Sequence, residues 1–403
     1  MISALEFRLY FGCFWCKNDH MIDRTIGPKI LKSSKSCLVL GPRQVGKSTL
    51  LESLRPELTI NLARESEYHL YTSQPGRLEQ VVEAKPFKSV FIDEIQRIPS
   101  LLNSVQALID ESKGRTKFYL SGSSARKLKR GQANLLPGRL LLFHLGGLSG
   151  SEIPSEISSE KLLRFGTLPE VALSGDDEFC VSLLEAYAGT YLREEIQAEA
   201  LVQNLQGFSR FLTEAGATAG QILDYSKISK RAKIPRTSCI RFFDILQDTF
   251  MIDRCDVYAD VKEGDPIKHP KYFFFDNGVR NALTGSFDLS PERKGLVFEH
   301  FIFNQLRNSL LAMNKKPEIK YFRTRTGLEV DFVVTMGKEI WAIEVKTGDV
   351  LDEDIKSLKV FERISSVPLR LAVVGLKEKN PRKLKGVLIC DWRKLLKEMG
   401  LSS

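Results

Sequence analysis

The sequence predicts an α/β protein in three successive parts: a domain with a parallel sheet, a helical segment and a second α/β domain. In the first part, apolar strand-like runs end in a glycine loop or an acidic pair and are followed by helix-like segments. That pattern is typical of parallel sheets. In the last part, a long helix-like segment precedes two strand-like runs that carry carboxylates. A chain of 403 residues is also longer than one compact core usually allows.

We expect the boundaries of these parts at 21–150, 151–270 and 271–403, with 1–20 as an extension that may not be native. The extension contains Cys13, Cys16 and His20. A zinc site needs four ligands, and no second pair of cysteines completes this one. The seven cysteines are dispersed, which does not resemble a disulfide framework.

The net charge is +9, and no apolar run approaches the length needed to cross a bilayer. We expect a cytoplasmic protein with no membrane association. Basic residues gather in two stretches, 112–151 and 225–243. Such stretches fit contact with nucleic acid, with DNA as the expected partner, but they also fit a solvated basic face with no specific partner.

The first domain carries the pattern G-x-x-x-x-G-K-[ST] between an apolar strand (37–40) and a helix-like segment (48–54). Glycines at these places let backbone N–H groups point at phosphate oxygens. Lys47 is expected to reach the β- and γ-phosphates of ATP and Ser48 to hold Mg²⁺. The residues expected to bind the nucleotide are Gly41, Pro42, Arg43, Gln44, Val45, Gly46, Lys47, Ser48 and Thr49.

Three further features complete the predicted ATPase site. The strand 89–93 ends in Asp93, a predicted Mg²⁺ ligand, and Glu94, which is placed to orient the attacking water. A third strand, 117–121, leads to Ser123, the candidate sensor of the γ-phosphate, and such a strand often lies between the other two. Arg139 and Arg126 are candidates for the arginine that stabilises the transferred phosphoryl group, in the same subunit or in a neighbour.

In the middle part, 221–248 reads as helix, turn, helix, because Pro235 breaks the chain and apolar residues recur at helical spacing after it. The following run could begin a β wing. If this winged helix binds DNA, Arg236, Ser238 and Arg241 lie near the start of its recognition helix. The alternative is a winged helix that packs between domains.

In the last part, Glu299 lies near the start of a helix, Asp331 lies in a strand, and Glu344 and Lys346 lie two apart in the next strand. Residues two apart on a strand share a face, and antiparallel pairing could bring Asp331 beside Glu344. Three carboxylates of this kind are expected to hold Mg²⁺ or Mn²⁺, with Lys346 as a catalytic residue beside the water that cleaves a phosphodiester. Surface ion pairs are the alternative.

The chain resembles the AAA-type ATPase superfamily and, more closely, a group of bacterial and archaeal ATPases of largely unassigned role. The resemblance rests on 41–48, 91–96, 120–126 and 272–283, and Gly166-Thr-Leu-Pro-Glu170 departs mildly from the Gly-Gly-Phe-Pro-Glu of that group. It implies a P-loop NTPase with an AAA-type parallel sheet, then a winged-helix segment. Asp331, Glu344 and Lys346 resemble the motif of the PD-(D/E)xK nucleases, which implies a restriction-endonuclease-like α/β domain.

These features predict an ATP-hydrolysing enzyme that controls a metal-dependent nuclease-like domain acting on DNA. The alternative is an ATP-driven signalling or scaffold switch whose nuclease-like domain only binds a protein partner. A ring translocase, which would form homo-oligomers, is a third and weaker hypothesis.

Overall fold

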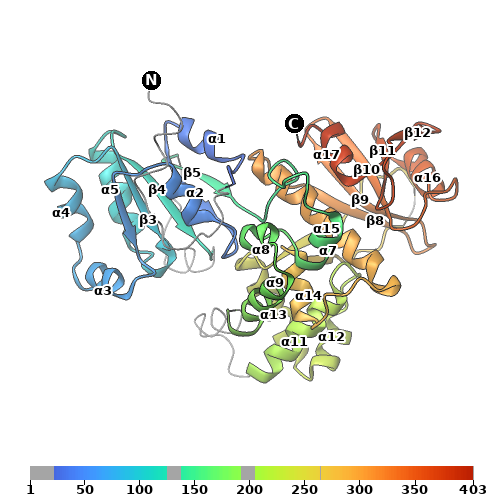
Figure 1. Ribbon diagram of the computed structural model, residues 1–403, viewed down its shortest axis with the longest axis horizontal. Helices are drawn as coiled ribbons and strands as arrows, with labels where there is room; N and C mark the ends of the chain where they lie inside the picture. The colour runs from blue at the N-terminus through green and yellow to red at the C-terminus, as the bar shows by residue number, and fades with distance from the viewer. Residues whose placement is uncertain (1–21, 125–137, 192–204, 264, 403) are drawn as a thin grey trace.

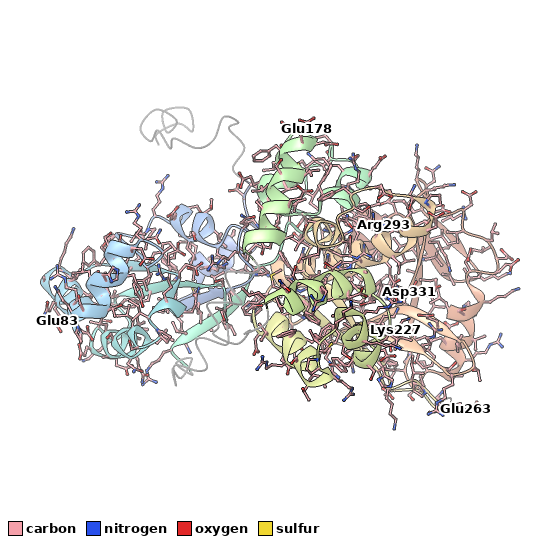
Figure 2. The ribbon with its side chains drawn as sticks, turned by 90° about the horizontal axis from the view of Figure 1, so that it is seen from below. Glu83, Glu178, Lys227, Glu263, Arg293 and Asp331 are labelled. Carbon is pink, nitrogen blue, oxygen red and sulfur yellow. The ribbon has the colours of Figure 1, made fainter. Side chains whose placement is uncertain are left out.

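The computed structural model describes residues 22–124, 138–191, 205–263 and 265–402. Figure 1 shows two lobes, an amino-terminal one in blue and cyan and a carboxyl-terminal one in orange and red, joined by the green and yellow helices. Figure 2 shows the same arrangement from below, with Glu83 at the far end of the first lobe and Asp331 in the second. Within the described residues, no helix has the length and apolar character to cross a membrane.

The amino-terminal lobe is a five-stranded sheet in the order β2-β3-β4-β1-β5, and every neighbouring pair is parallel. The third predicted strand, β4, lies between β3 and β1, as expected. The strands are β1 (Ser36–Leu40), β2 (Leu58–Asn61), β3 (Ser89–Asp93), β4 (Lys117–Gly122) and β5 (Leu140–His144). The helices are α1 (Gly27–Lys32), α2 (Lys47–Ser53), α3 (Glu65–Ser73), α4 (Arg77–Ala84), η2 (Ile95–Arg97) and α5 (Leu101–Glu111).

Both faces of the central strands β1, β3 and β4 are buried, which explains why these strands are largely apolar. Cys37 and Val39 of β1 point into a core shared with α1, α2 and the middle helices. Leu38 and Leu40 point to the other face, which α3, α4 and α5 cover. The first core therefore continues from the ATPase lobe into the middle segment.

The middle segment consists of helices followed by a β-hairpin. Its helices are α7 (Ser159–Phe165), α8 (Pro169–Leu173), α9 (Asp177–Ala186), η3 (Tyr187–Tyr191), α11 (Leu205–Thr218), α12 (Tyr225–Ala232) and α13 (Arg236–Asp248). Asp224 caps α12 by accepting from two backbone N–H groups, and Pro235 precedes α13. The strands β6 (Ile252–Val257) and β7 (Lys271–Phe274) pair antiparallel, and Ile222 forms a bridge with Lys271.

The carboxyl-terminal lobe is built on the long helix α15 (Pro291–Ala312) and a mixed sheet. The remaining strands are β8 (Ile319–Arg323), β9 (Glu329–Met336), β10 (Glu339–Lys346), β11 (Arg370–Gly375), β12 (Arg382–Leu384) and β13 (Val387–Cys390). The helices α14 (Asn277–Leu283), α16 (Lys356–Ile364) and α17 (Trp392–Glu398) complete it. The core under α15 and α17 is rich in aromatic residues, including Phe273, Phe303 and Trp392.

One sheet crosses the boundary that we expected at residue 270. Its order is β12-β13-β11-β10-β9-β8-β6-β7, because β6 pairs parallel with β8. The expected boundary falls inside the β6–β7 hairpin, so it does not separate two independent sheets. The middle helices and the last lobe are joined by backbone hydrogen bonds as well as by side-chain packing.

The segment 272–283 has a structural role at this junction. The carboxylate of Asp276 is fully buried and accepts from the N–H groups of Gly278 (2.8 Å) and Thr167 (2.6 Å). Asn281 donates to the carbonyl oxygens of Leu163 and Arg164. These contacts tie α14 to the end of α7, so the motif fixes packing between segments.

Candidate functional site

The loop between β1 and α2 folds closely around Lys47. The ammonium of Lys47 is buried and donates to the carbonyl oxygens of Gly41 (2.9 Å) and Pro42 (2.7 Å). Gly46 has φ = 87°, in the left-handed region that favours glycine. A Cβ on Gly41 would lie 2.0 Å from the carbonyl oxygen of Leu145, so only glycine fits between the loop and the segment after β5.

Ser48 and Asp93 meet at the carboxyl ends of β1 and β3. The hydroxyl of Ser48 lies 2.9 Å from both carboxylate oxygens of Asp93, and Ser121 of β4 also donates to this carboxylate. Burial raises the pKa of Asp93, because desolvation outweighs the hydrogen bonds from Ser121 and Ser48. A buried carboxylate beside a hydroxyl is an oxygen donor set that suits Mg²⁺.

Glu94 and Ser123 lie side by side, just beyond the ends of β3 and β4. The hydroxyl of Ser123 donates to the carboxylate of Glu94 at 3.1 Å. The amide of Gln96 donates to the same carboxylate and, at 2.9 Å, to Ser123. Sequence reasoning gave Gln96 no role, although it belongs to the segment 91–96, and it holds the orientation of Glu94.

Arg24 is a second residue that sequence reasoning missed. Its guanidinium is buried and donates to the carbonyl oxygens of Val45 (2.6 Å), Gly146 (2.9 Å) and Gly147 (3.2 Å). It also forms an ion pair with Glu152 at 3.2 Å. The phosphate-binding loop is therefore held by a residue that precedes α1 and by the chain that leaves β5.

Of the two candidate arginines, the structure describes Arg139, and it lies away from the site. Arg139 precedes β5 and pairs with Asp110 at 2.7 Å. Because β5 runs parallel to β1 and Ser36 aligns with Leu140, Arg139 lies at the edge of the sheet opposite the loop. The expectation that Arg139 binds the nucleotide of its own subunit is corrected by this geometry. Arg126 lies outside the described residues.

In the carboxyl-terminal lobe, Asp331 and Glu344 are cross-strand neighbours. Phe332 aligns with Ile343 in the antiparallel pair β9–β10, and one step further aligns these two carboxylates. Asp331 accepts from the N–H of Val345 at 2.8 Å. The ammonium of Lys346 lies 3.1 Å from Glu344, which confirms that the two side chains share a face.

Glu299 does not join this pair in the way we expected. Its carboxylate lies 3.0 Å from the ammonium of Lys271, which also lies 3.4 Å from Glu329. Among the described residues, no group of three or more His, Cys, Asp or Glu side chains is arranged to hold a metal ion. Glu299, Asp331 and Glu344 therefore do not form the expected set of three metal ligands, because Lys271 of β7 pairs with Glu299. Sequence reasoning missed Lys271, since nothing local marks it.

We call the side chains of Glu299, Glu329, Asp331 and Glu344 the acid cluster. Burial and the neighbouring carboxylates raise the pKa values of Glu299, Asp331 and Glu344. Burial raises the pKa of Glu344 to about 8, with the charge of Asp331 as the next cause. Burial also raises the pKa of Glu299 to about 7, although Lys271 lowers it. The pKa of Lys271 is raised because the surrounding carboxylates outweigh its own desolvation. Glu344 Oε2 is buried with no hydrogen-bond partner in the described part of the chain. Asp331 and Glu344 therefore suit a divalent cation, and Glu299 does not.

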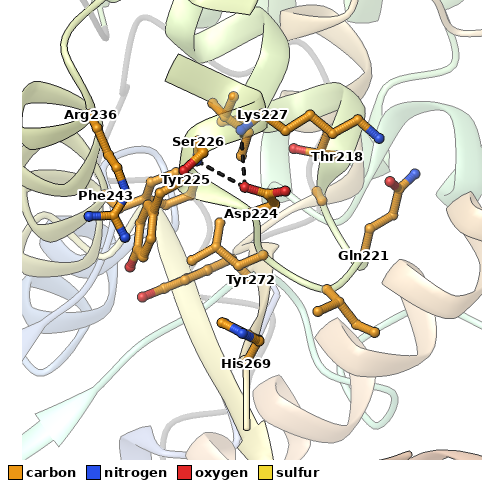
Figure 3. A pocket seen from close by; sticks show the side chains of 15 residues that line it. Thr218, Gln221, Asp224, Tyr225, Ser226, Lys227, Arg236, Phe243, His269 and Tyr272 are labelled. Atoms are coloured by element: carbon orange, nitrogen blue, oxygen red, sulfur yellow. Dashed lines mark hydrogen bonds between the residues drawn. The ribbon is translucent and has the colours of Figure 1, made fainter. Parts of the chain in front are cut away.

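A cavity of about 550 Å³ opens beside the first turn of α12 and the start of α13. Figure 3 shows Tyr225 and Tyr272 along it, with Arg236 at one end and Lys227 at the other. The six basic residues of 225–243 are all exposed: Lys227, Lys230, Arg231, Lys233, Arg236 and Arg241. In the other basic stretch, Lys117 is half-buried and donates to the carbonyl oxygens of Ile30, Leu31 and Ser33.

Three protein families match successive parts of the chain. The AAA domain family matches residues 33–154. Two domains of unknown function, DUF8612 and DUF4143, match residues 157–290 and 294–395. The first match covers the five-stranded sheet and its phosphate-binding loop. The amino-terminal lobe is therefore an AAA-type P-loop ATPase domain.

Similar whole proteins carry no assigned role. An uncharacterized protein of Mycobacterium tuberculosis is 26% identical over 319 residues, which cover 77% of this chain and 69% of that protein. An uncharacterized protein of Haemophilus influenzae is 22% identical over 338 residues, covering 76% and 81%.

Two solved structures align with the chain at low similarity. Aquifex aeolicus DnaA bound to AMPPCP aligns at 12% identity and a TM-score of 0.29, covering 55% of this chain and 86% of that one. Protein VC1899 from Vibrio cholerae aligns at 11% identity and a TM-score of 0.21, covering 92% and 98%. At such scores neither alignment establishes a shared fold.

Proposed function

We propose that the protein binds and hydrolyses ATP in its AAA-type domain and thereby controls a nuclease-like carboxyl-terminal domain that acts on DNA. The observation that carries the first half is the meeting of Lys47, Ser48, Asp93 and Glu94 at one edge of a parallel sheet, where ligands of open α/β sheets bind. Ser48 and Asp93 would hold Mg²⁺, which neutralises phosphate charge during transfer.

Each residue of this site has a definable task. Lys47 exchanges its bonds to the loop carbonyls for phosphate oxygens, which are stronger acceptors. Glu94, oriented by Gln96 and Ser123, positions the attacking water and accepts its proton. The test is ATP turnover of the intact protein. Lys47→Ala should lose nucleotide binding, whereas Glu94→Gln should retain binding and lose turnover.

The contact between the ATPase lobe and α15 supports control of the second lobe. A Cβ on Gly146, whose carbonyl Arg24 holds, would lie 2.2 Å from the amide oxygen of Asn308 on α15. Lys29 donates to the carbonyl oxygen of Met313 at 2.6 Å, just beyond the same helix. The helix α15 also carries Glu299. A movement of the phosphate-binding loop that shifts α15 would therefore also move one residue of the acid cluster.

The order α11, a bridge at Ile222, α12, α13 and the β6–β7 hairpin supports a winged helix. The exposed residues Arg236 and Arg241 of α13, with the cavity beside Lys227, form the proposed DNA-binding surface. The test is DNA affinity of Arg236→Ala and Arg241→Ala across a salt series. Phosphate contacts predict weaker binding in each variant and a shallower salt dependence. Binding that does not change with salt would contradict a DNA role.

For cleavage, labelled linear, circular and single-stranded DNA would be incubated with Mg²⁺ or Mn²⁺, with and without ATP. Activity that Asp331→Ala and Lys346→Ala both abolish would establish the nuclease. A second candidate, a switch that only binds a partner, is favoured by one observation, namely that Lys271 interrupts the expected metal set. No cleavage on any substrate, together with an ATP-dependent complex with a protein partner, would support that alternative.

A further inference from the structure

Lys271 is a buried cation that neutralises one half of the acid cluster, namely Glu299 and Glu329. Its side chain is only 5% exposed, and its ammonium contacts Glu299 of α15 and Glu329 of β9. The ring of Tyr321 lies under the same ammonium, 5.0 Å from it, on β8. The backbone of Lys271 is fixed by pairing with Cys255 and by the bridge to Ile222. Four elements thus hold this cation in place.

The other half of the acid cluster consists of Asp331 and Glu344, and one of its carboxylate oxygens has no such partner among the described residues. Asp331 accepts one backbone hydrogen bond, and Glu344 Oε1 accepts from Lys346, but Glu344 Oε2 is buried with no partner among the described residues. A buried carboxylate oxygen without a donor is costly, so such an atom marks a place that a bound cation or donor completes.

We propose that Lys271 is a built-in cation that takes the place of a metal at Glu299 and Glu329, so that a divalent ion is held by Asp331 and Glu344 without Glu299. Lys271 is a positioning residue, since it fixes Glu299 away from the metal. The inference rests on the proposed function only in placing a divalent cation in this lobe, and it concerns binding rather than cleavage.

The experiment measures Mn²⁺ binding to the intact, nucleotide-free protein by titration calorimetry. The difference between the natural protein and Asp331→Asn gives the Mn²⁺ bound at the carboxyl-terminal site, separate from any Mn²⁺ held at Ser48 and Asp93. We expect Asp331→Asn and Glu344→Gln to abolish this binding, while Glu299→Gln leaves the affinity unchanged. Lys271→Gln should tighten binding by about tenfold, because it removes a positive charge and frees Glu299. In that background, Glu299→Gln should remove the gain.

Two results would overturn the inference. One is a loss with Glu299→Gln as large as with Asp331→Asn, which would make Glu299 a ligand. The other is a folded Lys271→Gln protein with unchanged affinity. If Lys271→Gln does not fold, as judged by circular dichroism, the double variant Lys271→Gln/Glu299→Gln replaces it, because it keeps the net charge of the protein. The comparison of Glu299→Gln with Asp331→Asn still shows whether Glu299 is a metal ligand. Binding that appears only after Lys271→Gln would also overturn the inference, because the inference places a divalent ion at Asp331 and Glu344 while Lys271 is present. No binding in either protein would refute both the inference and a metal-dependent nuclease.

Discussion

Arg24→Ala is expected to destabilise the ATPase lobe by leaving Glu152 as a buried, unpaired charge. The two side chains are 7% and 1% exposed, and their closest atoms lie 3.2 Å apart. Removing one partner of a buried ion pair typically costs about 3–5 kcal/mol. Glu152 keeps hydrogen bonds from the N–H groups of Thr25 (2.7 Å) and Ser149 (2.9 Å), which offset part of this cost. We therefore expect a loss of about 3 kcal/mol, at the lower end of that range.

The same change removes the donor to the carbonyl oxygen of Val45 in the phosphate-binding loop. Arg24→Ala should therefore also weaken the binding of a fluorescent ATP analogue, whereas Arg24→Lys, which keeps a charge beside Glu152, should lose less stability. Stability is measured by urea unfolding followed by circular dichroism, and nucleotide binding by fluorescence titration.

A double-mutant cycle supplies the control. If the stranded charge is the cause, Arg24→Ala/Glu152→Gln should be more stable than Arg24→Ala alone by about 2 kcal/mol. A double variant whose loss equals the sum of the two single losses would refute the reasoning. Unchanged nucleotide affinity in a folded Arg24→Ala protein would refute the contribution of Arg24 to the loop.

Two further predictions concern the junction and the acid cluster. Asp276→Ala should cost about 3 kcal/mol in urea unfolding, because it removes the cap of α14 and leaves the buried N–H of Thr167 without an acceptor; a loss below about 1 kcal/mol would contradict this. Burial raises the pKa of Glu344 from 4.5 to about 8, so the folded protein binds more protons than the unfolded chain between these values, and metal-free stability should fall as pH rises across that window. Glu344→Gln should flatten this slope in urea unfolding across the pH series, and an unchanged slope would contradict the assignment.

Much of the nucleotide site could be predicted because its information is local. The strand, glycine loop and helix around Lys47 occur within about a dozen residues. Asp93 and Glu94 follow directly from a buried strand. Alternation along β10 likewise predicted that Glu344 and Lys346 share a face. The register that aligns Asp331 with Glu344 came from the structure.

The boundary at residue 270 was predicted less well, because the sequence does not show which strands share a sheet. The composition changes between the helices and the last part of the chain, but the pairing of β6 with β8 joins them. The position of Arg139 likewise could not be predicted from the sequence alone. Its distance from the loop depends on the direction in which β5 runs, and only the parallel register with β1 places it at the far edge.

The sequence by itself determined the phosphate-binding loop, the acidic strand ends and the alternating α/β pattern, since each depends on spacing within a single strand, turn or helix. The tertiary structure alone decided which charges neutralise one another. Arg24 reaches Gly146 across 122 positions, and Lys271 reaches Glu299 across 28 and Glu329 across 58. Buried charges need partners wherever the fold brings them together, and no local pattern records that choice.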